Sequence, residues 1–112
     1  MEQGAFHVFY CDFVRDQAVS SSRPEPLAAE RLRPLAETLL VAEDNYLGVV
    51  DAADTILQLY LSGREMTVEL IFPDSQGVLQ TRMPVEQALA LLESLPETFD
   101  EGLLPGAHYV TF

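Results

Sequence analysis

The sequence predicts an α+β fold: a mainly antiparallel sheet of five or six strands with two helical segments on one face. Two patterns predict this class. Between residues 46 and 83, short apolar stretches alternate with period two and are joined by turn residues. On either side of them, apolar residues instead follow helical spacing. Because 112 residues is a common size for one domain, we expect a single α+β domain over residues 1–112.

The first predicted strand covers residues 5–14. Aromatic and aliphatic residues fall on both of its alternating faces, which is typical of a strand covered on each side, so we place it centrally in the sheet. Residues 16–26 hold three serines and two prolines and predict a loop. Pro24 and Pro26 each favour extended backbone in the residue before them.

The first helical pattern runs through Leu27, Leu32, Leu35 and Leu39. Pro34 interrupts it, because a proline inside a helix removes one backbone hydrogen bond and clashes with the preceding turn. A proline is tolerated in the first turn, so we expect a short turn at residues 27–33 and a helix from 34 to about 41.

Four more strands are expected at residues 46–51, 55–61, 65–72 and 78–83. The connections between the first three are short enough for hairpins, which predicts an antiparallel meander. Leu57, Leu59 and Leu61 share one face, and we expect that face to meet the helices.

A second helix is expected from Pro84 to Leu95, since proline suits a helix start. The segment at residues 105–112 is apolar enough for a final short strand, and a loosely held end is the alternative. The expected order along the chain is therefore β-α-β-β-β-β-α-β.

The balance of charge is strongly acidic. Eighteen acids and six bases, all arginine, give a formal net charge of −12. Residues 41–112 hold twelve acids against Arg64 and Arg82, a net charge of −10. Such a field repels phosphate, which argues against nucleic acid and anionic membranes as partners and favours a basic protein. The alternative, that acidity only keeps a small protein soluble, stays open.

The location is expected to be cytoplasmic. No apolar stretch approaches the roughly 20 residues of a membrane-spanning helix, and residues 1–4 lack the pattern of a signal peptide. The single cysteine, Cys11, cannot form an internal disulfide and fits a reducing compartment as a small buried hydrophobe.

We expect no enzyme and no cofactor. His7 and Cys11 are four residues apart on a predicted strand, roughly 13 Å between Cα atoms, too far for a catalytic pair or a shared metal. His108 lies near the other end of the chain, and no glycine-rich phosphate loop is present. Asp44, Asn45 and the acids at 51 and 54 lack the spacing of a calcium loop.

Acidic and aromatic residues at strand and helix ends are the candidates for partner binding. Acidic loops beside aromatic residues suit an interface with aromatic anchors and a charged rim, although for each residue a solvated loop is the alternative. Whether they share one side of the fold stays open. The candidates are Glu43, Asp44, Tyr46, Asp51, Asp54, Tyr60, Glu97, Phe99, Asp100 and Glu101.

Three segments, residues 44–51, 55–60 and 95–100, resemble those of small acidic bacterial immunity proteins of toxin–immunity systems. The resemblance lies in strand and turn patterning over about the last two thirds of the chain, and it assigns no contact residue. It implies a cytoplasmic protein that neutralises a cognate bacterial toxin by direct binding. Charge reversal at Asp51 and Asp54, or at Asp100 and Glu101, is then expected to slow the capture of a basic toxin.

Two other functions stay open. One is a homodimeric structural or regulatory module, in which an edge strand or the carboxyl-terminal segment pairs with its copy. The other is a small enzyme or ligand-binding domain with a pocket between sheet and helices, which a deep pocket holding Cys11 or a histidine would favour.

Overall fold

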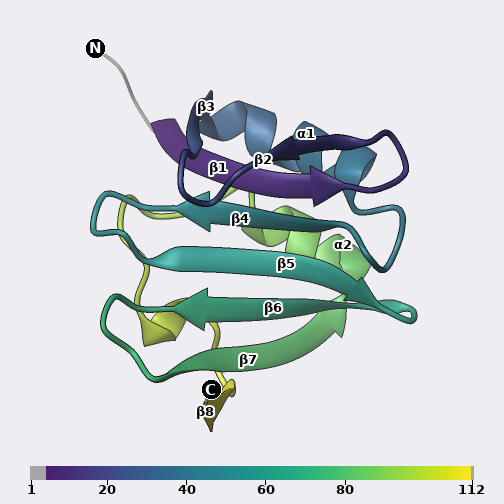
Figure 1. Ribbon diagram of the computed structural model, residues 1–112. Coiled ribbons are helices and arrows are strands. Elements are labelled where there is room, and N and C mark those ends of the chain that lie inside the picture. Colours follow the sequence, from purple (N-terminus) through teal and green to yellow (C-terminus); the bar gives the residue numbers. More distant parts are fainter. Residues whose placement is uncertain (1–4, 112) are drawn as a thin grey trace.

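In the part of the chain that the structure describes, eight strands form one antiparallel sheet, and two α-helices lie against one of its faces (Figure 1). This computed structural model describes residues 5–111. The strands are β1 (Ala5–Asp12), β2 (Gln17–Val19), β3 (Glu25–Ala28), β4 (Tyr46–Val50), β5 (Ile56–Ser62), β6 (Glu65–Ile71), β7 (Gly77–Pro84) and β8 (His108–Thr111). The helices are α1 (Leu32–Leu39) and α2 (Val85–Leu91), with the short 3-10 helices η1 (Ala29–Arg31) and η2 (Glu101–Leu103). The predicted α+β class is confirmed.

The loop predicted at residues 16–26 is wrong in part, because it contains β2 and the start of β3. Both strands pair with β1, β2 near its carboxyl end and β3 near its amino end. They lie along the edge of β1 that β4 leaves unpaired. Pro26 fits there, since an edge strand tolerates a residue without an N–H group. These two short strands raise the count from the predicted five or six to eight.

β1 is an interior strand, as expected, but it is not central. The order across the sheet is β2-β1-β4-β5-β6-β7-β8, with β3 also paired to β1, so β5 occupies the middle. Phe6 and Phe9 are buried on opposite faces of β1, whereas His7 is exposed. The prediction that both faces of this strand are buried is therefore right at Phe6 and Phe9 and wrong at His7.

The helix boundaries differ from prediction by a few residues. α1 begins at Leu32, so Pro34 lies in its first turn, where a missing N–H group leaves no hydrogen bond unmade. α2 begins directly after Pro84 and ends at Leu91, and turns continue the chain to Ser94. Between residues 5 and 111, no helix is long and apolar enough to cross a membrane.

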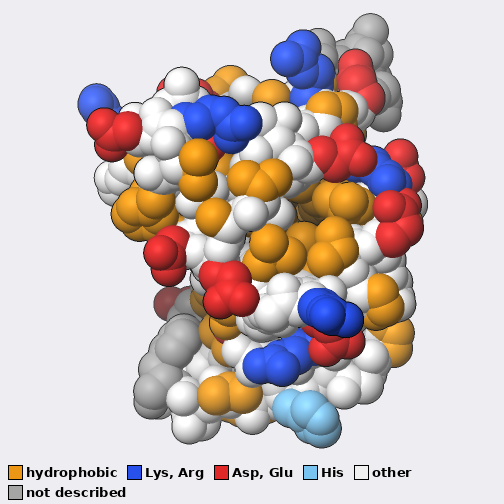
Figure 2. Space-filling model, turned by 90° about the vertical axis from the view of Figure 1, so that its right-hand side faces the viewer, with side chains coloured by type: hydrophobic (Ala, Val, Ile, Leu, Met, Phe, Trp, Pro, Cys, Tyr) orange, Lys and Arg blue, Asp and Glu red, His pale blue; other side chains and the backbone are white. Residues whose placement is uncertain are grey.

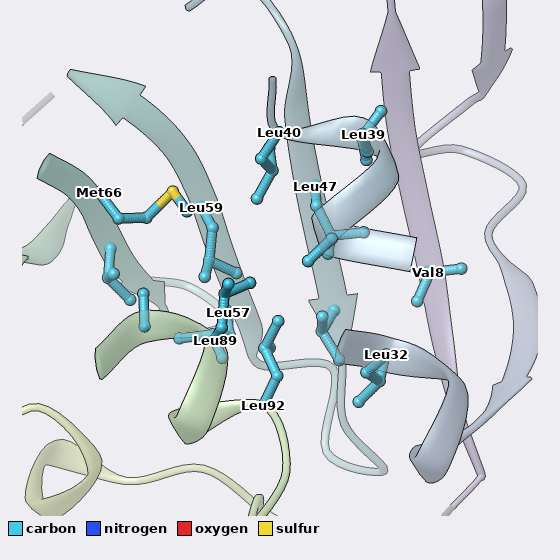
Figure 3. Close-up of a cluster of buried hydrophobic side chains, with 14 of the residues drawn as sticks. Val8, Leu32, Leu39, Leu40, Leu47, Leu57, Leu59, Met66, Leu89 and Leu92 are labelled. Atoms are coloured by element: carbon cyan, nitrogen blue, oxygen red, sulfur yellow. The ribbon is translucent and has the colours of Figure 1, made fainter. Parts of the chain in front are cut away.

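The hydrophobic core lies between the sheet and the two helices. Leu57 and Leu59 are fully buried and face the helices, as predicted for their side of β5. In Figure 3, leucines from both helical segments point toward the leucines of β4 and β5. Burial of one such side chain stabilises the fold by roughly 1.5–3 kcal/mol.

Within residues 5–111, no helix lies on the opposite face of the sheet (Figure 1), and we call it the open face. The strand register places its side chains in rows that cross several strands. One row is Phe9, Gly48, Gln58, Glu69, Gln80 and His108. The next row is Cys11, Tyr46, Tyr60, Thr67 and Arg82.

Candidate functional site

Three aromatic side chains meet on the open face where β1, β4 and β5 lie side by side. Tyr46 and Tyr60 are directly opposite each other on β4 and β5. The ring of Phe9 contacts Tyr46 edge to face, with 6.4 Å between ring centroids and 63° between planes. Phe9 lies directly over Gly48, because a Cβ atom at position 48 would collide with its ring. Glycine therefore leaves the space that the ring of Phe9 occupies.

Beside these rings the surface is hollowed, with a volume of about 560 Å³. This size lies within the range of roughly 300–1,000 Å³ that is usual for ligand pockets. We call it the aromatic hollow. It brings together four of the predicted residues, Glu43, Asp44, Tyr46 and Tyr60. Its lining residues are Phe9, Ser21, Glu43, Asp44, Asn45, Tyr46, Ile56, Gln58 and Tyr60.

The loop that carries the two acids is held by Asn45, whose side chain is fully buried. Its amide nitrogen donates to the carboxylate of Asp12 at 3.0 Å and to the carbonyl of Leu39 at 2.8 Å. Its amide oxygen accepts from the backbone N–H of Phe13 at 2.8 Å. Asn45 thus ties the ends of β1 and α1 to the start of β4, which fixes Asp44 and Tyr46 on either side of it.

Asp12 completes this network. Burial raises the pKa of its carboxyl group, but hydrogen bonds from Arg15, Asn45 and Val14 outweigh that effect and leave the pKa below its ordinary value. Its partners include the backbone N–H and the guanidinium of Arg15, both at 3.1 Å. The carboxylate is therefore an anchor for the turn after β1.

Neither acid of the aromatic hollow has a cationic partner within residues 5–111. Glu43 accepts a hydrogen bond from the backbone N–H of Gly63 at 2.9 Å. The four ion pairs of that part of the chain involve Arg15 and Arg33 instead. No arginine lines the aromatic hollow, so its charge is negative.

A third carboxylate, Glu69, lies in the open face beside the aromatic hollow and is only 8% exposed. It accepts hydrogen bonds from the amide nitrogens of Gln58 at 3.2 Å and Gln80 at 2.6 Å. The hydroxyl of Tyr60 donates to it at 3.3 Å. Burial raises the pKa of Tyr60, and the charge and hydrogen bond of Glu69 raise it further, so the phenol stays protonated.

The second group of predicted residues lies at the other end of β4. Asp51 is buried and its carboxylate accepts from the backbone N–H groups of Ala53 at 2.8 Å and Thr55 at 2.9 Å. It also accepts from the N–H of Phe99 at 2.6 Å. Charge reversal at Asp51 would remove these acceptors, so it would test folding and not the capture of a partner.

Phe99 is a core residue. Its side chain is 4% exposed and stacks on Phe6 with 5.8 Å between ring centroids, so it offers no exposed aromatic anchor. Asp100 accepts from the N–H of Gly102 at 2.9 Å and caps η2. The remaining acids of this group, Asp54, Glu97 and Glu101, are exposed.

The ten predicted residues therefore do not form one site. Tyr46 opens β4 and Asp51 follows its last residue, so the strand separates the two groups by roughly 16 Å. Only the group at Tyr46 combines exposed acids with accessible aromatic rings. The sequence analysis missed Phe9, Gln58 and Glu69, which period two assigns to the open face; only the strand register shows that they lie in one row.

Two further hollows lie on the helix side. One, of about 790 Å³, is lined by Arg33 and several acids, and Arg33 already binds Glu37, Glu86 and Glu93. The other, of about 410 Å³, lies between β7, α2 and η2.

None of the three hollows described within residues 5–111 is lined by Cys11 or a histidine. In the same part of the chain, no three His, Cys, Asp or Glu side chains are grouped to hold a metal ion.

Charged and hydrophobic side chains are mixed on the end of the molecule that lies on the right in Figure 1. Figure 2 shows that hydrophobic groups gather in the middle of this end and that acidic and basic groups lie around them. Phe13, Val14 and Val41 are among the exposed large hydrophobic residues.

Comparisons with protein-family models, with curated proteins and with solved structures found no match for this chain.

Proposed function

We propose that this protein is an acidic protein-binding module, a cytoplasmic bacterial immunity protein that neutralises a cognate toxin by direct binding. One observation carries the protein-binding part. The aromatic hollow brings the rings of Phe9, Tyr46 and Tyr60 together with the carboxylates of Glu43 and Asp44 on the open face, which no helix of the described residues covers. Aromatic side chains with charged groups at their margin are the usual composition of a protein interface.

The charge of the whole chain supports a basic partner. A net charge of −12 attracts a cationic surface over several ångströms and speeds its encounter with the protein. Glu43 and Asp44 can bind that surface without breaking an internal ion pair, because none of the ion pairs within residues 5–111 involves them.

The resemblance to immunity proteins supports a toxin as that partner. Two of the three segments that carry it, residues 44–51 and 55–60, form most of β4 and β5. These strands supply Tyr46 and Tyr60 to the aromatic hollow. The third segment, residues 95–100, contains Phe99, which binds the turn after β4 through Asp51.

Co-expression tests this function. The product of the neighbouring gene is produced in a bacterial host with this protein or with an unrelated acidic protein of the same size. We expect that the gene product alone stops growth, that this protein restores growth, and that the two purify together. If the gene product is harmless and forms no complex with this protein, the immunity function is wrong.

A homodimeric module is the second candidate, and the edge of the sheet at β8 favours it. All four residues from His108 to Thr111 are exposed, with Tyr109 at 55% and Val110 at 44%. β8 pairs only with β7 within the described residues and carries neither lysine nor proline, the groups that keep edge strands from pairing. A mass that rises with concentration, and that Val110→Lys holds at one chain, would support it.

A further inference from the structure

We infer that the aromatic hollow binds an arginine side chain presented by the protein partner. The inference rests on the proposed function only for the nature of that partner. The guanidinium group would bind in the site that β1, β4, β5 and the loop before β4 form. The residues that would contact the guanidinium are Tyr46, Tyr60, Glu43 and Asp44.

The first step is the charge of the site. Glu43 and Asp44 line the aromatic hollow, and Glu69 lies beside it in the open face, where it accepts hydrogen bonds from Tyr60 and Gln58. Glu69 receives its hydrogen bonds from two amides and a phenol, and none of the ion pairs within residues 5–111 involves it. Carboxylates at the margin of a hollow attract an opposite charge. A cation is therefore the group that this surface favours.

The contrast with the hollow around Arg33 supports this step. There the acids Glu37 and Glu93 also line a depression, but the guanidinium of Arg33 bonds to both at 3.1 Å. The chain thus supplies its own arginine to the carboxylates between α1 and α2. Within residues 5–111, the carboxylates of the aromatic hollow receive no such group.

The second step is the shape and chemistry of the rings. Tyr46 is 36% exposed, and Phe9 packs against it edge to face, which holds the tyrosine ring in place. Tyr60 stands opposite on the next strand, and its hydroxyl is fixed by Glu69. An aromatic face attracts a cation, and a planar guanidinium stacks on it better than an ammonium group does.

The third step separates arginine from lysine. A guanidinium presents several N–H donors in one plane, so it stacks on a ring and still bonds to carboxylates at the margin. In the aromatic hollow, the loop residue Asp44 and the strand residue Tyr46 flank the buried Asn45, which fixes both. The hollow therefore offers aromatic rings from the strands and carboxylates from the loop before β4 side by side, which suits a guanidinium, whereas a lysine offers a single point charge.

The test uses the full chain, labelled with ¹⁵N, and no toxin. It is titrated with the amides of N-acetylarginine, N-acetyllysine and N-acetylcitrulline, the last being a neutral analogue of arginine. We expect arginine to shift the backbone signals of Tyr46, Gly48 and Tyr60 most, and citrulline to bind at least about tenfold more weakly. Equal shifts from arginine and citrulline, or shifts spread over all acidic loops, would overturn the inference.

Two pairs of variants sharpen the test. Tyr46→Leu and Asp44→Asn should each weaken binding of the arginine amide about fivefold, the size of one exposed cation–π contact or charged hydrogen bond. Tyr109→Leu and Glu97→Gln change an exposed tyrosine and an exposed acid elsewhere and should leave binding unchanged. If Tyr46→Leu fails to fold, Asp44→Asn alone decides, since Asp44 is an exposed loop residue.

Failure of this inference and failure of the proposed function give different results. A chain that protects against the toxin but does not prefer arginine is an immunity protein that uses other contacts. If the chain binds arginine at Tyr46 but captures no toxin, the arginine site is supported and the immunity function is wrong.

Discussion

Single buried polar residues organise both ends of β4. The side chain of Asn45 holds the loop before the strand through three hydrogen bonds to Asp12, Phe13 and Leu39. The carboxylate of Asp51 holds the turn after the strand through two hydrogen bonds within that turn and one from the distant Phe99. The sequence marks both as polar residues at the ends of the predicted strand 46–51 but gives no sign that they are buried. Phe99 is 48 residues from Asp51, and no local pattern encodes a contact over that separation.

Gly48 is required for Phe9 to lie on the open face. We expect Gly48→Ala to lower the free energy of unfolding by about 2 kcal/mol, because the added methyl group would collide with the ring. Urea denaturation measures this change. In a Phe9→Leu background, the same substitution should cost much less, since the smaller side chain gives way. An equal cost in both backgrounds would mean that the strain lies elsewhere.

Asp12 makes stability depend on acid pH. Its pKa is lowered in the folded chain, so it stabilises the protein above the unfolded-state value of about 4 and loses this contribution as the pH falls through the folded value. We expect Asp12→Asn to be less stable than the original chain at pH 7 and to approach it near pH 2. Thermal unfolding over this range measures the difference, and a constant difference would contradict the role.

At the scale of the element, Arg33 joins the two helices. Its guanidinium bonds to Glu86 at 2.7 Å on α2, to Glu37 at 3.1 Å on α1, and to Glu93 at 3.1 Å beyond α2. The hydrogen bonds that Arg33 donates, first to Glu86 and then to Glu37, raise its pKa above the ordinary value. One side chain thus holds three carboxylates that would otherwise repel each other.

The stabilisation that the ion pairs of Arg33 provide should decrease as salt rises. We expect Arg33→Met, which keeps most of the apolar stem, to lower the midpoint of thermal unfolding in dilute buffer and to lower it less at about 1 M salt, where such pairs are screened. Arg31→Met is the matched control, because no ion pair of Arg31 is found within residues 5–111. Equal effects of the two substitutions would show that the network adds nothing.

The elements that the sequence predicts well are those with a strong internal pattern. Period-two alternation identifies β4 to β7, and helical spacing identifies α1 and α2 to within a few residues. β2 and β3 are only three and four residues long and contain exposed or proline residues, so they have no such pattern. They form because β1 offers them an unpaired edge, and that edge exists only in the assembled sheet.

At the scale of the whole molecule, negative charge is the dominant property. The net charge of −12 comes mostly from residues 41–112, which contain β4, β5 and both groups of predicted acids. The fold divides these acids between two ends of the sheet, and composition alone does not reveal that division. The candidate site is therefore predictable as a type of surface, acidic and aromatic, but its place depends on the strand register.

Association with a basic toxin should be fast and sensitive to salt. We expect the association rate constant to fall steeply as salt rises, because charge steers the encounter, and the dissociation rate to change little. Asp44→Arg should slow association more than Glu97→Arg, since Glu97 lies with the group of acids at the other end of β4. Stopped-flow mixing measures both, and equal slowing would indicate only a general effect of charge.

The most direct test of the central claim combines the co-expression assay with paired double variants. We expect Asp44→Arg with Tyr46→Ala to abolish co-purification with the neighbouring gene's product and rescue of growth. The matched pair Glu97→Arg with Tyr109→Ala should retain both. If the first pair still protects the cell, or if only the second pair fails, the aromatic hollow is not the surface that binds the toxin.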